Sequence, residues 1–355
     1  MTAARAWLYA TVLMTVVALV SAIVLAPPAG AAPTRALSWL LFTGSSVHVA
    51  STAWLFTVPA VRGYAVLHPV RCLVVPVCLV VGAGAAAAAF SPVRFQWLLL
   101  PYFGWQFHHY QKQNIGIASL AASAQRAGPL VPAERWPLRL AGWAGIAALV
   151  ARPGLLGLHA QPLSHSPLAH GVFLISAATY GIAVAAGVAA IARRPHALLP
   201  AGFCAIYLTC LLFCLPAFAF GSPYAAVGGM TIAHGAQYLL LVTLIAGGGA
   251  GRAPRRLSRP ISLALLANIS FIGGAALSAS SHLHNASQLG RLAFGAYLGV
   301  VMAHFVIDAG LWRMRDPLAR RFLSTHLPYL MPSKPDPGGA NATRVVRLPI
   351  DRQPI

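Results

Sequence analysis

The sequence predicts an all-α protein, a polytopic bundle of about ten transmembrane helices with both termini in the cytoplasm. Three observations predict this fold class. Hydrophobic residues make up 58% of the 355 residues and charged residues only 8%, whereas an ordinary soluble domain has roughly 25% charged residues. Apolar runs long enough to cross a bilayer recur along the chain. The charges between these runs are mostly arginines, and they gather in every second connection.

Ten segments have the roughly 20 mostly apolar residues that a membrane-spanning helix needs. The first follows Arg5 and could be a signal peptide, but its apolar stretch exceeds the usual core of about 7–15 residues, so we expect a retained helix. The fifth contains Arg152 and Pro153 and is expected to be short, kinked or re-entrant. The ten segments are residues 6–26, 37–60, 71–91, 95–119, 138–158, 171–192, 197–220, 225–248, 261–281 and 291–313.

The charge pattern predicts the orientation. Lys and Arg number 25 against five acidic residues, which gives a net charge of +20. Under the positive-inside rule, the connections that follow the even-numbered segments face the cytoplasm. They carry Arg62 and Arg71; Arg126, Arg135 and Arg139; Arg193 and Arg194; Arg252, Arg255, Arg256 and Arg259; and Arg313, Arg315, Arg320 and Arg321.

The other connections carry only the isolated Arg35, Arg94 and Arg291. Because the cations form no stripe on a soluble domain, we expect no nucleic-acid partner. The sequence therefore predicts a multi-pass protein of the cytoplasmic membrane. Residues 1–325 are expected to form its single transmembrane domain. Residues 326–355, rich in proline, are expected to form a mostly disordered cytoplasmic tail.

Histidines interrupt four of the even-numbered segments, which run in the same predicted direction. Ionisable side chains at membrane depth are costly and mark functional sites. Counted from the outer ends, these histidines lie about 8 to 14 residues in, a spread of about 10 Å along the membrane normal. We therefore predict one layer of imidazoles near the middle of the membrane, made by His48, His108, His109, His234 and His304.

Asp308 is the only acidic residue inside any predicted segment. It follows His304 by four residues, so the two side chains project from one helix face. A metal ion held by imidazoles is a natural partner for this carboxylate. Two other readings stay open: Asp308 pairs with Arg313 or Arg315, and each histidine is an interhelical hydrogen-bond partner.

Further polar residues surround these candidates. Gln237 shares a helix face with His234, and Gln113 shares one with His109, so either amide could orient an imidazole. Tyr110 and Tyr238 are expected beside the ligands, and Lys112 is expected to snorkel to the cytoplasmic interface. The outer connections carry five more histidines, which could form a second metal site, form an entry route or be exposed loop residues: His159, His165, His170, His282 and His284.

The histidines on separate helices, together with the segment from His304 to Asp308, carry a resemblance to a known family. In this respect the sequence resembles the bacterial multi-pass enzymes of the Brp/Blh beta-carotene dioxygenase type, which oxidise lipophilic substrates. The usual histidine boxes of membrane desaturases are absent. The resemblance implies iron as the metal and dioxygen as a substrate.

These observations favour a membrane-embedded, non-haem iron oxygenase or oxidase, with a di-iron site and a lipophilic or small natural-product-type substrate. Its metal ligands would be the five histidines and Asp308, and Tyr110, Tyr238 and Gln237 would act around them. Dioxygen and an unidentified electron donor would be its partners. Two alternatives use the same residues: a b-type haem protein with axial histidines, and a proton-coupled transporter. A purely structural subunit remains a further reading.

Overall fold

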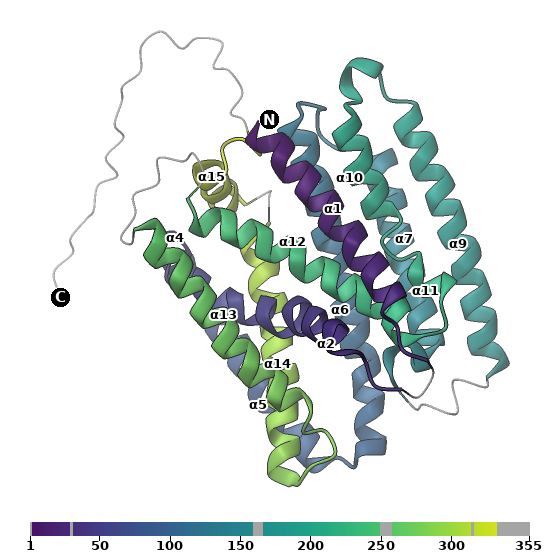
Figure 1. Ribbon diagram of the computed structural model, residues 1–355, viewed down its shortest axis with the longest axis vertical. Coiled ribbons are helices and arrows are strands. Elements are labelled where there is room, and N and C mark those ends of the chain that lie inside the picture. Colours follow the sequence, from purple (N-terminus) through teal and green to yellow (C-terminus); the bar gives the residue numbers. More distant parts are fainter. Residues whose placement is uncertain (1, 29–30, 159–165, 249–257, 314–315, 332–355) are drawn as a thin grey trace.

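The computed structural model describes residues 2–28, 31–158, 166–248, 258–313 and 316–331, and these residues form helices and connections but no strand (Figure 1). Three of the helices are short π-helices, η1, η2 and η5, and two are 3-10 turns, η3 and η4. In chain order the elements are α1 Ala3–Val24, α2 Arg35–Phe42, η1 Thr43–Val47, α3 His48–Leu55, α4 Pro59–Leu67, η2 Val70–Val74, α5 Val75–Ala89, α6 Pro92–Ala124, α7 Pro132–Ala151, η3 Pro153–Leu156, α9 Pro167–Ala192, η4 His196–Leu198, α10 Ala201–Leu211, α11 Pro216–Ala219, η5 Tyr224–Gly228, α12 Gly229–Ala246, α13 Arg259–Ser281, α14 Gln288–Leu311 and α15 Pro317–His326.

Six helical segments among the described residues are long and apolar enough to cross a membrane. Their outer faces are apolar too: Val24 of α1, Ile175 of α9 and Ile272 of α13 are each about 70% exposed. Large apolar side chains pointing outward on this scale fit a lipid environment. The chain thus has the character of a multi-pass membrane protein. The six segments are Ala3–Val24, Val70–Ala89, Pro167–Ala192, Tyr224–Ala246, Arg259–Ser281 and Gln288–Leu311.

The remaining four predicted segments differ from continuous apolar spans. Residues 37–60 divide into α2, η1 and α3, and residues 197–220 divide into α10 and α11. Residues 95–119 lie within the 33-residue helix α6, whose centre is rich in polar side chains. The helix in residues 138–158 begins earlier, at Pro132, and ends at Ala151, because Pro153 cannot continue it. The described helices therefore do not confirm the expected number of ten spans.

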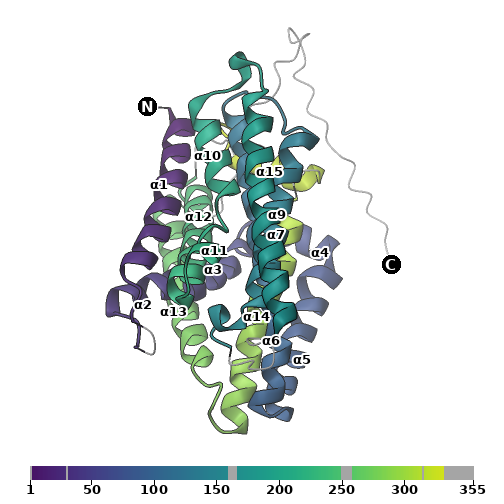
Figure 2. The ribbon, with the colours of Figure 1, turned by 90° about the vertical axis from the view of Figure 1, so that its right-hand side faces the viewer.

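The start of α1, helix α15 and the connection between α9 and α10 lie at the same end of the molecule, and α14 begins at the opposite end (Figures 1 and 2). An ion pair fixes two connections at the first end. The Arg194 guanidinium, just after α9, donates to both carboxylate oxygens of Glu134 at the start of α7, at 2.5 and 2.8 Å. Arg194 also donates to the carbonyl oxygens of Ala127 and Pro129. This end carries the predicted arginine clusters of α15 and of the connection after α9.

Glycine lets α14 and α5 approach closely. A Cβ atom added to Gly295 or Gly299 would lie closer than 3.0 Å to the backbone of α5, at Ala83 and at Leu79 and Val80 respectively. The two glycines are four residues apart, which is the spacing of close helix–helix contacts in membranes. A similar close contact at a glycine occurs near His48. An added Cβ on Gly235 of α12 would overlap the backbone of Gly44 in η1.

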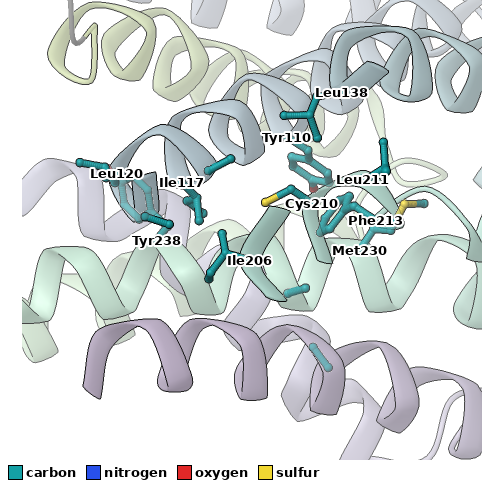
Figure 3. Close-up of a cluster of buried hydrophobic side chains, with 14 of the residues drawn as sticks. Tyr110, Ile117, Leu120, Leu138, Ile206, Cys210, Leu211, Phe213, Met230 and Tyr238 are labelled. Carbon is teal, nitrogen blue, oxygen red and sulfur yellow. The ribbon is translucent and has the colours of Figure 1, made fainter. Parts of the chain in front are cut away.

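The main apolar core lies between α6, α7, α10 and α12 (Figure 3). Large side chains there are completely or almost completely buried, Phe203, Tyr207 and Met230 among them. The core also takes in Leu327 and Leu330, which are 0% exposed, so the described residues of the predicted tail up to 331 are packed. The rest of the predicted tail lies outside the described residues.

Candidate metal centre

Four histidines and one aspartate from four helices meet in the interior of the bundle. His48 begins α3, His109 lies in the centre of α6, His234 lies in α12, and His304 and Asp308 lie one turn apart on α14. Their exposed fractions range from 1% to 8%. The predicted layer of imidazoles is therefore a cluster, because the helices that carry it are neighbours.

The four imidazoles form a closed ring of neighbours. The ring centroids of His48 and His234 are 5.0 Å apart, those of His234 and His109 are 5.0 Å apart, and His304 lies 5.1 Å from both His109 and His48. Metal–nitrogen bonds of about 2.0–2.1 Å put two imidazoles of one ion roughly 4.5–5.2 Å apart, centroid to centroid. The observed spacing matches that of imidazoles sharing one ion.

The donor atoms of this cluster lack hydrogen-bond partners among the described residues. Buried polar groups are almost always paired, and an unpaired group needs an explanation. Here seven such atoms occupy one place. Since a neutral imidazole has one lone pair and one N–H, the four imidazoles and the carboxylate oxygen offer five lone pairs of the kind that a transition metal takes. The atoms are both ring nitrogens of His48, both ring nitrogens of His234, Nε2 of His109, Nε2 of His304 and Oδ2 of Asp308.

Two overlapping triads have donor atoms within 4.8 Å of one another. One is His48, His234 and His304, and the other is His109, His304 and Asp308. The free Oδ2 of Asp308 lies 3.7 Å from Nε2 of His304 and 4.0 Å from Nε2 of His109. Because His304 belongs to both triads, the five side chains form one group of donors.

A chain of hydrogen bonds fixes the orientation of His304. Its Nδ1 lies 2.7 Å from Oγ1 of Thr52, which lies 2.9 Å from the Tyr238 hydroxyl. That hydroxyl donates to Oδ1 of Asp308 at 3.1 Å. If His304 donates to Thr52, Thr52 donates to Tyr238 and Tyr238 donates to Asp308, then Nδ1 of His304 carries the proton. Its Nε2 then presents a lone pair to the cluster.

Aromatic rings enclose the cluster on two sides. Tyr110 stacks on His234 with centroids 4.0 Å apart, and its hydroxyl is bonded to Gln106 and Thr231. Phe305 stacks on His109 with centroids 4.6 Å apart. Such stacked rings pack against the imidazoles and favour one orientation of each.

Among the described residues, the hydrogen bonds of Gln113 and Gln237 go to partners other than the imidazole rings. Gln113 donates to the carbonyl oxygen of His234 and to Oε1 of Gln237, both at 3.0 Å. Gln237 in turn donates to Oγ1 of Thr15 in α1 at 2.8 Å. This amide chain joins α6, α12 and α1, so Gln113 and Gln237 hold the helices that carry His109 and His234.

His108 lies apart from the cluster, contrary to its expected role as a ligand beside His109. Successive residues of a helix point about 100° apart, and His109 is the one that faces the cluster. The His108 ring packs against Trp143 of α7, with centroids 5.0 Å apart. Of the outer histidines, His170, His282 and His284 are exposed, and His159 and His165 lie outside the described residues.

Sequence reasoning missed Thr52. It lies four residues after His48 on the same face of α3 and is 4% exposed. A threonine in an apolar helix often bonds only to its own backbone, so the sequence offers no signal for its contact with His304.

No protein family, curated protein or solved structure matches the chain. The resemblance based on the histidines therefore stays a prediction, and the functional argument rests on the geometry of the cluster.

Proposed function

We propose that the protein is a membrane-embedded, non-haem iron oxygenase or oxidase. Its ion is held by His48, His109, His234 and His304, and Asp308 is a fifth ligand or the partner of an ion-bound water. The observation that carries the proposal is the convergence of seven unpartnered polar atoms, of which five can each offer a lone pair, inside the described bundle. Leaving that many buried polar atoms unpaired would be costly, and one bound cation would satisfy most of them.

The donor set favours one ion over the two expected from the sequence. His304 belongs to both triads, but its Nδ1 is bonded to Thr52, so only Nε2 is free. One lone pair cannot serve two ions. The two triads therefore describe one site with four nitrogen donors and one oxygen donor.

The type of donor favours iron. Magnesium and calcium prefer oxygen ligands, whereas imidazoles suit iron, copper, nickel and zinc. A structural zinc site is closed with four ligands, and this cluster offers five. Iron with five protein ligands would retain one octahedral position, where it would supply the activation of dioxygen.

An apolar groove beside the cluster supports a lipophilic substrate. It has a volume of about 340 Å³ and lies between α5, α6 and α14, lined by Leu98, Trp105 and Met302 among others. The Trp105 ring meets Phe305 edge-on at 5.8 Å, and Phe305 stacks on His109. We propose that an apolar substrate enters this groove from the bilayer and reaches the ion past Phe305.

Two other functions were open from the sequence. A b-type haem is disfavoured because the four imidazoles surround one point, where a macrocycle would need free space in one plane. A proton-coupled carrier is favoured by one observation, the hydrogen-bond chain from Asp308 to His304. Metal content separates the two functions, since a carrier that relays protons purifies without stoichiometric iron.

The proposed location is the cytoplasmic membrane, with the arginine-rich end in the cytoplasm. The start of α1, helix α15 and the α9–α10 connection lie at one end of the molecule (Figure 2). The arginines gathered at that end support this orientation.

Metal quantification on the detergent-purified protein tests the proposal. We expect about one iron per chain in the unmodified protein and near-complete loss in His109→Ala. The neighbouring His108→Ala is the matched control and should keep its iron, because that ring faces Trp143. Iron absent from the unmodified protein after growth in iron-rich medium would contradict the proposal, and so would equal loss in both variants.

A further inference from the structure

A second pocket lies between α6 and α7. Its volume is about 400 Å³, and it is partly open to the outside. His108, Lys112 and Arg139 give it its polar side, and Ile115 and Ile146 are among its apolar walls. It therefore faces another side of α6 than the one that carries His109 into the cluster.

The cations of this pocket are not neutralised within the described residues. Three carboxylates are described. Glu134 pairs with Arg194, Asp308 accepts from Tyr238, and Asp316 caps α15 through the Leu318 amide. None of them pairs with Lys112 or Arg139, and the Arg139 guanidinium only lies over the Trp136 ring at 5.4 Å. Two exposed cations beside one cavity attract an anion.

The apolar side of the pocket requires that a ligand have an apolar part as well as an anionic group. Trp143 lies on its rim and is 56% exposed, so its ring is open to a ligand or to lipid. The floor is built by Gln111, whose amide donates to the Leu138 carbonyl oxygen and fills the space above Gly142. A ligand that fits has an anionic group at one end and apolar chains at the other.

Both cations of the pocket lie in the halves of α6 and α7 that are nearer the end with the Glu134–Arg194 pair. Arg139 lies seven residues after Pro132, the first residue of α7, which is about 10 Å along the helix at 1.5 Å per residue. The Glu134–Arg194 pair lies at that same end of α7. A bilayer has roughly 5–8 Å of polar region on each side of its hydrocarbon core. Arg139 therefore starts deeper than that polar region, and Lys112 lies 12 residues, about 18 Å, before the end of α6. Both long side chains have to extend toward this end to meet a lipid phosphate.

We propose that this pocket binds an anionic phospholipid, with the lipid phosphate between Lys112 and Arg139 and an acyl chain over Trp143 and Ile146. A guanidinium binds two phosphate oxygens at once, and an ammonium adds a point charge. Basic pockets between membrane helices recognise lipid headgroups in this way. The proposal does not depend on the metal centre, because it uses none of the five cluster residues.

The full-length protein, reconstituted in phosphatidylcholine vesicles, tests this site with spin-labelled phosphatidylglycerol as the probe. We expect an immobilised lipid component that is larger for phosphatidylglycerol than for spin-labelled phosphatidylcholine. In the double variant Lys112→Gln, Arg139→Gln the preference should fall by about fivefold for each charge removed. The double variant Arg62→Gln, Arg193→Gln is the control. It removes two exposed arginines that do not line the pocket, and it should keep most of the preference.

Three results would overturn the proposal. The unmodified protein could hold both lipids equally. The two double variants could lose the preference to the same extent, which would indicate general surface charge. Millimolar inorganic phosphate could displace the labelled lipid fully at constant ionic strength, which would assign the pocket to a soluble phosphate. The variant Lys112→Arg, Arg139→Lys keeps both charges and should restore the preference.

Discussion

Oγ1 of Thr52 lies 2.7 Å from Nδ1 of His304, and this contact decides which nitrogen of His304 faces the cluster. The same oxygen lies 2.9 Å from the Tyr238 hydroxyl, which donates to Asp308. Thr52 therefore connects an imidazole and a carboxylate that are one turn apart on α14. A side chain that is not itself a proposed ligand thus orients a proposed ligand.

Replacing Thr52 by valine should weaken the metal site. Valine has nearly the shape of threonine but cannot bond to Nδ1 of His304, so the imidazole loses its fixed orientation. We expect a 10- to 100-fold loss of metal affinity, as is typical when such a supporting bond is removed. Competition with a chelator of known affinity measures the loss.

The control for this prediction is Thr52→Ser, which keeps the hydroxyl and should retain affinity close to that of the unmodified protein. If Thr52→Val binds the metal as tightly as Thr52→Ser does, the hydroxyl has no part in the site.

The sequence predicts the composition of the site better than its geometry. His48, His109, His234, His304 and Asp308 can be found from sequence because polar groups in apolar segments stand out. The sequence does not show which of two neighbouring histidines faces inward, so the predicted ligands include His108 as well as His109. The register of α6 depends on contacts from other helices, such as Phe305 on His109 and Trp143 on His108.

The breaks in the helices could not be predicted either. The π-helix η1, Thr43–Val47, directly precedes His48, and η5 directly precedes α12. A π-turn adds a residue to the helical turn and rotates the side chains that follow it. Residues 37–60 contain no charged side chain and are mostly apolar, so hydropathy predicts one span. Tertiary contacts such as the close approach of Gly235 to Gly44 favour the interrupted helix instead.

Substitution of Gly235 by alanine should disturb the cluster through helix packing, although Gly235 is not one of its five residues. The added Cβ would overlap the carbonyl group and Cα of Gly44, both of them backbone that cannot rotate away. The helices carrying His234 and His48 would have to separate. We expect a loss of about 1–3 kcal/mol in stability, typical of overpacking, and lower iron content. Thermal unfolding in detergent and metal quantification check both effects.

The matched control for that experiment is Gly116→Ala. Gly116 is also a helical glycine, in α6, but an added Cβ would meet nothing within 4 Å. Alanine there should be neutral or slightly stabilising, since it favours the helix over glycine. Equal destabilisation by both substitutions would show that the contact of Gly235 with Gly44 is not tight in solution.

Removing the guanidinium of Arg194 should destabilise the end of the molecule that contains the start of α7 and the α9–α10 connection. Glu134 is 0% exposed, and Arg194→Gln would leave its carboxylate buried without a cation. Breaking one partner of a buried ion pair typically costs about 3–5 kcal/mol. We expect a clearly lower unfolding temperature, whereas Arg193→Gln, at an exposed position, should leave it unchanged.

The same ion pair has a defined pH dependence. Hydrogen bonding to Glu134 raises the pKa of Arg194 above its ordinary value. A raised pKa means that the stabilisation is complete below the ordinary pKa of arginine and is lost only above it. Deprotonation of Arg194 therefore removes no stability between pH 7 and 9. A difference between the unmodified protein and Arg194→Gln that shrinks across this range would contradict the assignment.

Metal removal should lower the stability of the whole bundle. A ligand that binds only the folded state stabilises it by about 2.7 kcal/mol when its free concentration is 100 times its dissociation constant. The cluster joins α3, α6, α12 and α14, so an ion there links four helices. After treatment with a chelator we expect the unfolding temperature to fall by several degrees, and ferrous iron should restore it. His109→Ala should unfold at the same temperature with and without chelator, whereas His108→Ala should respond like the unmodified protein. If magnesium restores stability as well as iron does, the nitrogen-rich cluster is not the responsible site, because magnesium selects oxygen ligands.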